Sequence, residues 1–385
     1  MKLNTKLEFF TKPLITLILI IPLFASCSRQ RIFISENTSV DFKSLTFNNK
    51  IDFSYAEKIS IEKTEGYSLV KIQGEKPALV IEDNYPAPKN IPSEYTICRK
   101  PLDKTYLVST SAMDFFIKLD ILPSVKFSCI KKENWFLQEA VDAMEKKELV
   151  HAGKYSAPDY ELLLKEGCNI AIENTMIYHK PEVKEKLAVL GIPVIVEKSS
   201  YEKNPLGRLE WIKFYGLLYG KEEKAENFFS SKIKELSSFS SEKKSDRTVA
   251  FFYITSSGTA NVRKSSDYIP KMISMSGGKY FLDESSDNEN NHSTMNMQFE
   301  NFYAKAVDAD ILIYNSTIDG ILSDRNELLK KNNLFEDFKA YKNERIYCTK
   351  ENFFQETTGI TDFIIDLNKV LKDDERELTY LDKLK

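Results

Sequence analysis

Histidine is scarce in this chain of 385 residues, and the short motifs of common catalytic sites are absent. Each observation argues against one class of function. Only three histidines are present, His151, His179 and His292, whereas a zinc carrier brings several histidines and carboxylates together. The sequence contains no G-x-S-x-G, no H-E-x-x-H and no glycine-rich phosphate loop. An enzyme and a carrier of free metal ions are therefore disfavoured, and no catalytic residue, metal ligand or resident cofactor is expected.

An excess of charge of one sign is also missing. Lysine and arginine total 54 and aspartate and glutamate total 57, which gives a formal net charge of −3. No basic block is free of interleaved acidic residues. Because binding to phosphates requires a basic face, a nucleic acid is not an expected partner.

Long hydrophobic runs are confined to the N-terminus. Three lysines precede the apolar run at residues 14–24, which has the length of a signal-peptide core and is too short to span a bilayer. The run ends in Ala25-Ser26-Cys27 and resembles a bacterial lipobox. We expect Cys27 to be lipidated and residues 28–50 to form a tether on the periplasmic side of the cell envelope. An ordinary cleavable signal peptide is the alternative.

Cysteine is present five times, and none of the five has C-x-x-C spacing. Besides Cys27 the chain has Cys98, Cys129, Cys168 and Cys348, for which three complete pairings are possible. Export to an oxidising compartment permits disulfides, and buried free thiols are the simpler interpretation.

The composition is that of a globular protein, with 42% apolar and 29% charged residues, and the length suffices for two domains. After a predicted hairpin at residues 51–82, strand and helix patterns alternate. Strands are predicted at residues 105–109, 125–130, 169–173, 193–196, 248–255, 311–314 and 345–348. Helices are predicted at residues 112–119, 135–147, 158–166, 181–190, 267–276, 300–307, 334–341 and 361–371. This alternation is typical of parallel sheets wrapped by helices.

The stretch at residues 204–240 separates two segments of similar character. Asn204 and Pro205 have the side chains of a helix N-cap and first turn, and apolar residues follow at helical spacing to Tyr219 and again from Ala225. We predict two tandem helices here that link two α/β lobes. The predicted boundaries are residues 51–220 for the first lobe, 221–246 for the linker and 247–385 for the second lobe. The polar run at residues 283–296 is predicted to be a loop.

Five segments, in their order and spacing, carry a resemblance to a known family. They are HAGKYSAPDYELLLKEGCNIAI, LAVLGIPVIV, LGRLEWIKFYGLLYGKEEKAENFF, SDYIPKMISMSGGKYF and QFENFYAKAVDADILIY. From about residue 51 to about residue 371 the chain resembles the substrate-binding proteins of ABC importers whose two lobes are bridged by one long helix and which carry ferric siderophores, haem or cobalamin. The resemblance implies two Rossmann-like lobes with a ligand cleft between them.

The resemblance also implies partners. A monomeric, lipid-anchored member would deliver its ligand to a membrane permease and its ATPase. A ferric siderophore is the first choice of ligand, followed by cobalamin and haem, and a periplasmic sensor with the same fold is an alternative. Proteins of this family dock through one carboxylate on each lobe, and by position in the motif these are Glu161 and Glu300. The alternative is that both are ordinary solvated helix glutamates.

The ligand is expected at loops that follow the carboxyl ends of strands, between the lobes. These loops place Asn84-Tyr85, Thr110-Ser111, residues 174–178, Ser200-Tyr201, Arg263 and residues 315–317 in the predicted site. Tyr85, Tyr178 and Tyr201 could stack on a planar ligand, Arg263 could face an anion, and Asn315 could supply a polar contact. Plain packing is the alternative for each of them.

Overall fold

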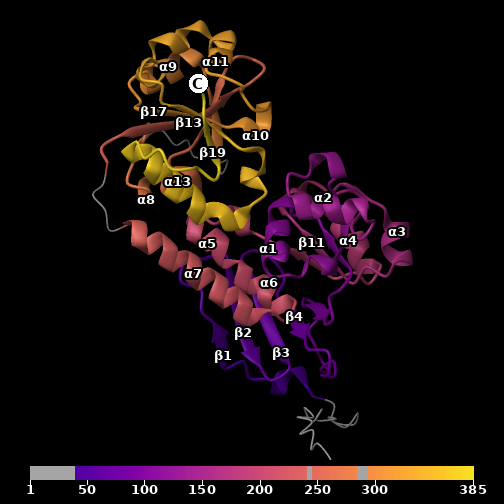
Figure 1. Ribbon diagram of the computed structural model, residues 1–385. Coiled ribbons are helices and arrows are strands. Elements are labelled where there is room, and N and C mark those ends of the chain that lie inside the picture. The colour runs from indigo at the N-terminus through magenta and orange to yellow at the C-terminus, as the bar shows by residue number, and fades with distance from the viewer. Residues whose placement is uncertain (1–39, 241–244, 284–292) are drawn as a thin grey trace, which may run out of the picture. The chain divides into compact units, whose positions relative to one another are not determined.

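A computed structural model describes residues 40–240, 245–283 and 293–385 (Figure 1). Residues Ser39–Lys385 form one compact unit. The predicted signal peptide and Cys27 lie outside the described residues, and so does most of the predicted loop at residues 283–296.

The chain first forms a five-stranded sheet, which we call the N-terminal sheet. Its strands are β1 (Asn49–Ile51), β2 (Ile59–Thr64), β3 (Tyr67–Ile72), β4 (Ala78–Ile81) and β5 (Thr96–Arg99), in that spatial order. All neighbours are antiparallel except β4 and β5. The predicted hairpin is confirmed, and its turn contains Gly66 at φ +76°, a conformation that favours glycine. The short strands β1 and β5 were not predicted.

The N-terminal lobe is built on a parallel sheet. Its order is β12 (Val194–Val196), β11 (Ile170–Glu173), β6 (Thr105–Leu107), β7 (Val125–Ser128) and β8 (Val150–His151), and every pair is parallel. Its helices are α1 (Met113–Lys118), α2 (Gln138–Glu145), α3 (Tyr160–Lys165) and α4 (Pro181–Val189). A two-stranded hairpin of β9 (Gly153–Lys154) and β10 (Ala157–Pro158) precedes α3. The predicted α/β fold is confirmed.

Alternate side chains of these strands enter two different cores. Ile170 and Ile172 of β11 pack with α1, α2 and α6, whereas Ala171 between them packs with α3 and α4. Since successive strand residues point to opposite faces, the unbroken apolar run of β11 is the pattern of a strand buried on both sides.

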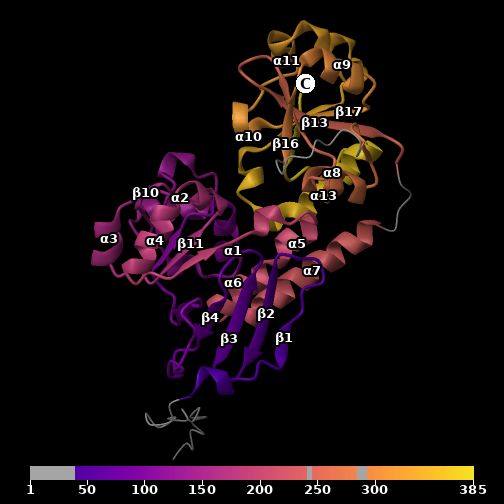
Figure 2. The ribbon, with the colours of Figure 1, turned by 180° about the vertical axis from the view of Figure 1, so that it is seen from behind.

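Three helices bridge the lobes: α5 (Pro205–Glu210), α6 (Ile212–Leu218) and α7 (Glu222–Ser240). The predicted helix start is confirmed, because the Asn204 side chain accepts a hydrogen bond from the Leu206 N–H at 3.0 Å. The prediction of only two helices is wrong, since the first is interrupted at the fully buried Trp211. Helix α7 packs against α6 and against α13 (Ile360–Lys372), and α6 and α7 lie beside the N-terminal sheet (Figure 2).

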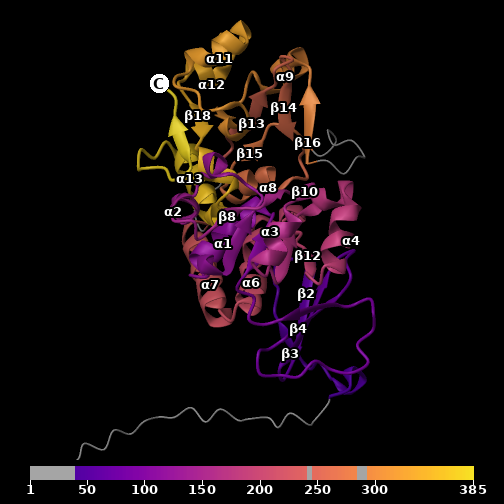
Figure 3. The same cartoon turned by 90° about the vertical axis from the view of Figure 1, so that its right-hand side faces the viewer.

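The C-terminal lobe contains a mixed sheet (Figure 3). Its order is β16 (Thr294–Met297), β14 (Ala260–Arg263), β13 (Thr248–Ile254), β17 (Ile311–Tyr314), β18 (Ile346–Thr349) and β19 (Leu381–Lys383), and β15 (Lys279–Tyr280) also pairs with β13. The pairs of β13 with β15 and β17, and of β17 with β18, are parallel; β14, β16 and β19 join antiparallel.

Helices cover both faces of this sheet as well. One face packs with α8 (Tyr268–Met275) and α13, and the other with α9 (Phe299–Ala306), α11 (Asn326–Lys331) and α12 (Lys339–Lys342). Helix α10 (Ser316–Asp319) follows β17.

Two predictions about the C-terminal lobe are wrong. Residues 334–341 do not form one helix, because Phe338 is extended and divides a 3-10 turn at Asn333–Asp337 from α12 while its ring fills the core. The end of the predicted loop at residues 283–296 is strand β16, which pairs with the unpredicted strand β14.

Two further observations bear on the predictions. Cys98, Cys129, Cys168 and Cys348 are free thiols, and three of them are buried, as the simpler interpretation expects. Within residues 40–240, 245–283 and 293–385, no helix combines the length and the apolar character needed to cross a membrane.

Candidate functional site

Two adjoining cavities, which together we call the cleft, lie between the lobes. They have volumes of about 610 Å³ and about 170 Å³ and share Ser200, Arg208, Tyr268 and Phe354 as lining residues. The walls come from the turn after β12, from α5, from the start of α8 and from the loop after β18. The cleft therefore lies where the bridging helices begin, between residues of both lobes.

Arg208 is the central cation of the cleft. Its guanidinium lies 3.5 Å from the centroid of the Tyr268 ring, and its Nε donates to the Glu202 carbonyl oxygen at 3.0 Å. A second hydrogen bond runs to the carbonyl oxygen of Ser200. Burial lowers the pKa of Arg208 from its ordinary value, and nearby Tyr268 acts in the opposite direction. Within the described part of the chain no carboxylate lies within ion-pair distance of Arg208, although Asp267 and Glu197 are near enough to raise its pKa.

Arg263 at the end of β14 approaches the same aromatic group. Its guanidinium is 5.0 Å from the Phe354 ring centroid and 5.9 Å from that of Tyr268. Its Nη1 lies 3.7 Å from Oδ1 of Asp267, whose side chain also caps α8 by accepting from the Ile269 N–H. Both arginines thus lie over the Tyr268 ring and Arg263 also lies over Phe354, a geometry in which cation–π attraction orders the guanidinium groups.

The rim of the larger cavity adds two more cations, Lys58 and Lys203. Of the two acidic lining residues, Asp267 caps α8, and Glu202 accepts hydrogen bonds from backbone N–H groups and from Trp211 Nε1. The surplus of positive charge favours an anionic ligand, and the Tyr201, Tyr268 and Phe354 rings offer apolar and stacking surface.

Contacts between the lobes lie at and next to the smaller cavity, which is lined by Ser111 and Thr357. Gln355 accepts from the Phe136 N–H at 2.9 Å and donates to the Asn134 carbonyl oxygen at 2.9 Å. The Thr357 hydroxyl donates to the Ser111 carbonyl oxygen at 2.9 Å. These bonds hold the loop after β18 against the N-terminal lobe.

The structure brings some of the predicted ligand residues together. Tyr201 and Arg263 line the larger cavity, Ser200 lines both cavities, and Ser111 lines the smaller one. The Tyr201 hydroxyl accepts a hydrogen bond from Thr175 at 3.0 Å.

Other predicted residues lie elsewhere. Tyr85 lies in the loop after β4, where its hydroxyl donates to Glu65 and its ring packs on Tyr67 of the N-terminal sheet. Tyr178 bonds Glu75 near the β3–β4 turn, and Asn315 caps α10 with its side chain. None of the three lines the cleft, and ligand contact for Tyr85, Tyr178 and Asn315 stays a prediction.

Sequence reasoning did not single out Lys58, Arg208, Tyr268 or Phe354 as ligand residues. Arg208 and Tyr268 belong to segments that carry the family resemblance, but nothing in the sequence indicates that their side chains are in contact. No local pattern marks Lys58 or Phe354, because only the tertiary fold brings them to the cleft.

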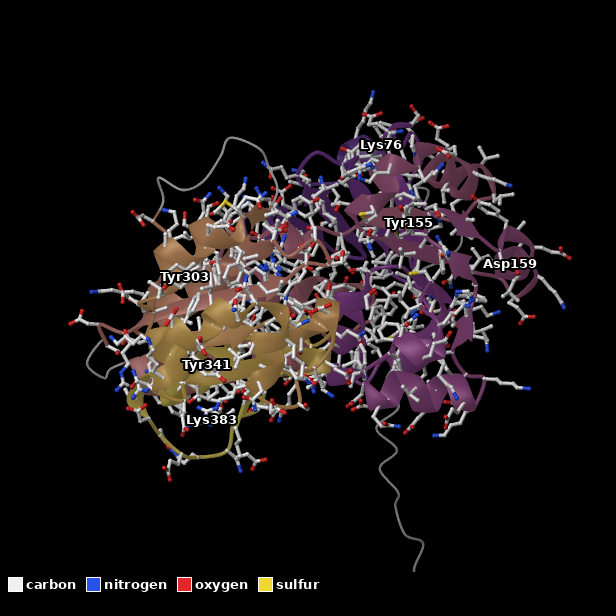
Figure 4. The ribbon with its side chains drawn as sticks, turned by 90° about the horizontal axis from the view of Figure 1, so that it is seen from above. Lys76, Tyr155, Asp159, Tyr303, Tyr341 and Lys383 are labelled. Carbon is white, nitrogen blue, oxygen red and sulfur yellow. The ribbon has the colours of Figure 1, made fainter. Side chains whose placement is uncertain are left out.

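Glu161 and Glu300 lie outside the cleft lining. Each occupies the first turn of a short helix, α3 and α9 respectively, and each side chain is exposed. Asp159, which caps α3, and Tyr303 of α9 lie at opposite sides in Figure 4. Among the described residues, no group of three or more histidine, cysteine and acidic side chains could hold a metal ion.

Comparison with known proteins gives relatives without an assigned activity. No family model matches the chain. An uncharacterized lipoprotein of Methanocaldococcus jannaschii is 24% identical over 300 residues, which are 74% of this chain and 69% of the other. A second uncharacterized lipoprotein of that organism is 24% identical over 355 residues, 88% of this chain and 87% of the other.

Solved structures resemble this chain in fold. The periplasmic haem-binding protein HutB of Vibrio cholerae has a TM-score of 0.57 at 13% identity, over 71% of this chain and 98% of its own. A periplasmic binding protein of Veillonella parvula gives 0.57 at 12% over 81% and 97%. An ABC-type Fe3+-hydroxamate transport protein of Saccharomonospora viridis gives 0.52 at 14% over 70% and 93%. The chain therefore has the two-lobed fold of the substrate-binding proteins of ABC importers, as the resemblance implied.

Proposed function

We propose that this protein is the substrate-binding component of an ABC importer and that it carries an anionic ferric chelate, a siderophore, in the cleft. The observation that supports this most is that Arg208 and Arg263 both lie over the Tyr268 ring, with Phe354 beside Arg263. A chelate with anionic oxygens and flat rings matches both features, since guanidinium groups bind oxyanions through several donors and aromatic side chains stack on planar groups.

The proposal also draws on proteins of the same fold. HutB binds haem, and the Saccharomonospora viridis protein belongs to a hydroxamate transport system. Haem carries two carboxylates and is the second candidate. Cobalamin offers less anionic charge to the cationic rim and is the third. A periplasmic sensor would use the same cleft, and genes for a permease and an ATPase beside this one would favour the importer.

Native mass spectrometry tests the proposal. Purified protein is mixed in turn with ferric tris-catecholate, ferric tris-hydroxamate, haem and cobalamin, and we expect the tris-catecholate complex to bind most tightly. The double change Arg208→Ala with Arg263→Ala should abolish that complex, whereas Arg376→Ala, an exposed arginine paired with Asp374, should retain it. Failure of every chelate to bind the wild-type protein would contradict the proposal.

We propose further that Cys27 carries the lipid anchor and that the protein acts outside the cytoplasm. The lipobox-like Ala25-Ser26-Cys27 supports this, and so do the lipoprotein names of the two relatives. Cys27→Ala should move the protein from the membrane fraction to the soluble fraction. Sedimentation of the variant with membranes after a high-salt wash would argue for another anchor.

A further inference from the structure

The segment between β1 and β2 is held by two buried carboxylates, Glu210 of α5 and Glu202 of the turn before α5. Glu210 accepts hydrogen bonds from the N–H groups of Ser54, Tyr55 and Ala56 at 2.9, 2.7 and 2.9 Å. Glu202 accepts from the N–H groups of Glu57 and Lys58, the latter at 2.8 Å. Five consecutive backbone donors are therefore held by carboxylates about 150 residues away in sequence.

Close packing fixes the same segment. Gly207 of α5 lies under Tyr55, and a side-chain carbon at Gly207 would come within 2.7 Å of the Tyr55 carbonyl oxygen. Lys213 of α6 donates to the carbonyl oxygen of Asp52 at 2.9 Å. Because both ends of the segment are bonded and its middle is in contact with α5, the position of Lys58 relative to Arg208 is set by the fold.

Lys58 is placed at the cleft by this arrangement. It lines the larger cavity together with Lys203, Arg208 and Arg263, and its carbonyl oxygen accepts from the Gln73 N–H at 2.8 Å. Within the described residues, its ammonium group has no carboxylate partner.

Three lysines of the neighbouring N-terminal sheet differ from Lys58. Lys63 is paired with Glu222, and Lys50 and Lys71 are paired with Glu62. An unpaired ammonium group at a cavity that already holds two arginines raises the local electrostatic free energy unless an anion arrives. The charge of Lys58 is therefore available to a ligand, whereas the charges of these three are already balanced.

We infer that Lys58, supplied by the segment between β1 and β2, selects the ligand by charge: it contacts the anionic oxygens of the bound chelate and discriminates against neutral chelates. Glu202 is a positioning residue, because its carboxylate holds the Lys58 backbone. This inference rests on the proposed function. It adds that the protein selects chelates of negative charge and that Lys58 is the residue that selects them.

The expected effect is large enough to measure. A hydrogen bond to a charged group contributes more than one between neutral groups, so loss of the Lys58 ammonium should weaken binding of an anionic chelate by roughly tenfold. A neutral chelate of similar size would lose little, since it offers Lys58 no charge.

The experiment compares the binding of an anionic chelate and a neutral chelate to four proteins. Affinities of trianionic ferric tris-catecholate and neutral ferric tris-hydroxamate are measured by tryptophan fluorescence for the wild type, Lys58→Ala, Lys58→Glu and the control Lys71→Ala. Lys71 belongs to β3 of the N-terminal sheet, is half exposed and pairs with Glu62 outside the cleft. Unfolding temperatures of all four proteins show whether each variant is folded.

We expect Lys58→Ala to weaken the tris-catecholate roughly tenfold, Lys58→Glu to weaken it further, and Lys71→Ala to change neither affinity. Equal affinities of the wild type and folded Lys58→Ala for the tris-catecholate would overturn the inference and leave the proposed function standing. A wild type that binds only the neutral complex would also overturn the inference. If the wild-type protein binds neither chelate, both the inference on Lys58 and the proposed binding of a ferric siderophore are overturned.

Discussion

The carboxylate of Asp114 in α1 accepts two hydrogen bonds from Thr358, one from its backbone N–H at 2.7 Å and one from its hydroxyl at 2.6 Å. The two residues are 244 positions apart in sequence and join the N-terminal lobe to the start of α13. Asp114 is 1% exposed, and Lys118 Nζ lies 3.8 Å from its other oxygen. Burial raises the pKa of Asp114 to about 6, although the bonds from Thr358 act to lower it.

This contact predicts a pH dependence of stability. The pKa of Asp114 is higher in the folded state than in the unfolded state, so between about pH 4 and pH 6 the folded protein binds more protons and loses stability as the pH rises. The loss is about 3 kcal/mol at most. Asp114→Asn keeps an acceptor for Thr358 and cannot ionise. Its unfolding free energy relative to the wild type should therefore rise between pH 4 and pH 7, as measured by urea denaturation. A difference that is the same at both pH values would contradict this assignment.

A second buried carboxyl group, Glu173 of β11, predicts that stability depends on pH over a wider range than for Asp114. It is fully buried, neither of its oxygens has a hydrogen-bond partner among the described residues, and burial raises its pKa to about 8. Because the folded-state pKa is raised, wild-type stability should fall as the pH rises from about 4.5 to about 8, by up to ~5 kcal/mol.

The test of Glu173 is a substitution that cannot ionise. Glu173→Met places an apolar chain of similar length in an apolar core and should raise the unfolding temperature at pH 8.5 more than at pH 5. Glu185→Ala, an exposed glutamate on α4, serves as the control and should show no such dependence. Equal shifts for Glu173→Met at both pH values would mean that Glu173 stays ionised in the folded protein.

The three hydrogen bonds that Glu210 accepts from the backbone predict that its replacement lowers stability. Glu210→Ala leaves the N–H groups of Ser54, Tyr55 and Ala56 without their acceptor and should lower the unfolding free energy by about 2–4 kcal/mol. Glu210→Gln retains one acceptor oxygen and should lose less. Thermal unfolding against the Glu185→Ala control measures both effects, and a loss no larger than that of the control would show that water replaces the carboxylate.

The exposed pair Glu161 and Glu300 predicts a separation of ligand binding from delivery. Changing both to Ala should leave chelate affinity unchanged, since neither lines the cleft, and should weaken docking to a permease roughly a hundredfold if each charge contributes ~1.5 kcal/mol. Uptake of labelled chelate by cells that carry the variant checks this. Glu185→Ala with Glu336→Ala, one exposed glutamate in each lobe, is the matched control. Normal uptake would identify Glu161 and Glu300 as ordinary solvated residues.

Much of the fold could be predicted because its signals are local. Buried strands such as β17 appear as short apolar runs, and Asn204-Pro205 marks the start of α5 by capping chemistry alone. The strands β14 and β16 were missed because each is stabilised by its partner across a sheet and not by its own composition. The helix predicted at residues 334–341 is interrupted at Phe338, because burial of this ring in the core outweighs the helical preference of the residues around it.

The site was predictable only in part for the same reason. Tyr201 and Arg263, which line the candidate cleft, follow from the rule that ligands lie at the carboxyl ends of strands and in the loops between lobes, and their contact with a ligand stays a prediction. Tyr85 met the same criterion and yet packs on Tyr67 of the N-terminal sheet, because a loop position does not say which sheet a ring will cover. Arg208 is placed by a contact with Tyr268, 60 residues later, which no spacing rule could reveal.

The carboxylates that hold residues 54–58 also set the order in which the chain can fold. The N–H groups of Ser54, Tyr55 and Ala56 are synthesised about 150 residues before Glu210, their acceptor. At roughly 5–20 residues per second, that interval lasts about 8–30 s, longer than the formation of a hairpin by several orders of magnitude. The hairpin of β2 and β3 can therefore form early on the ribosome, but its attachment to the helices must wait until α5 has emerged. Nascent chains halted before residue 210 should accordingly expose residues 52–58 to proteases that the finished protein resists.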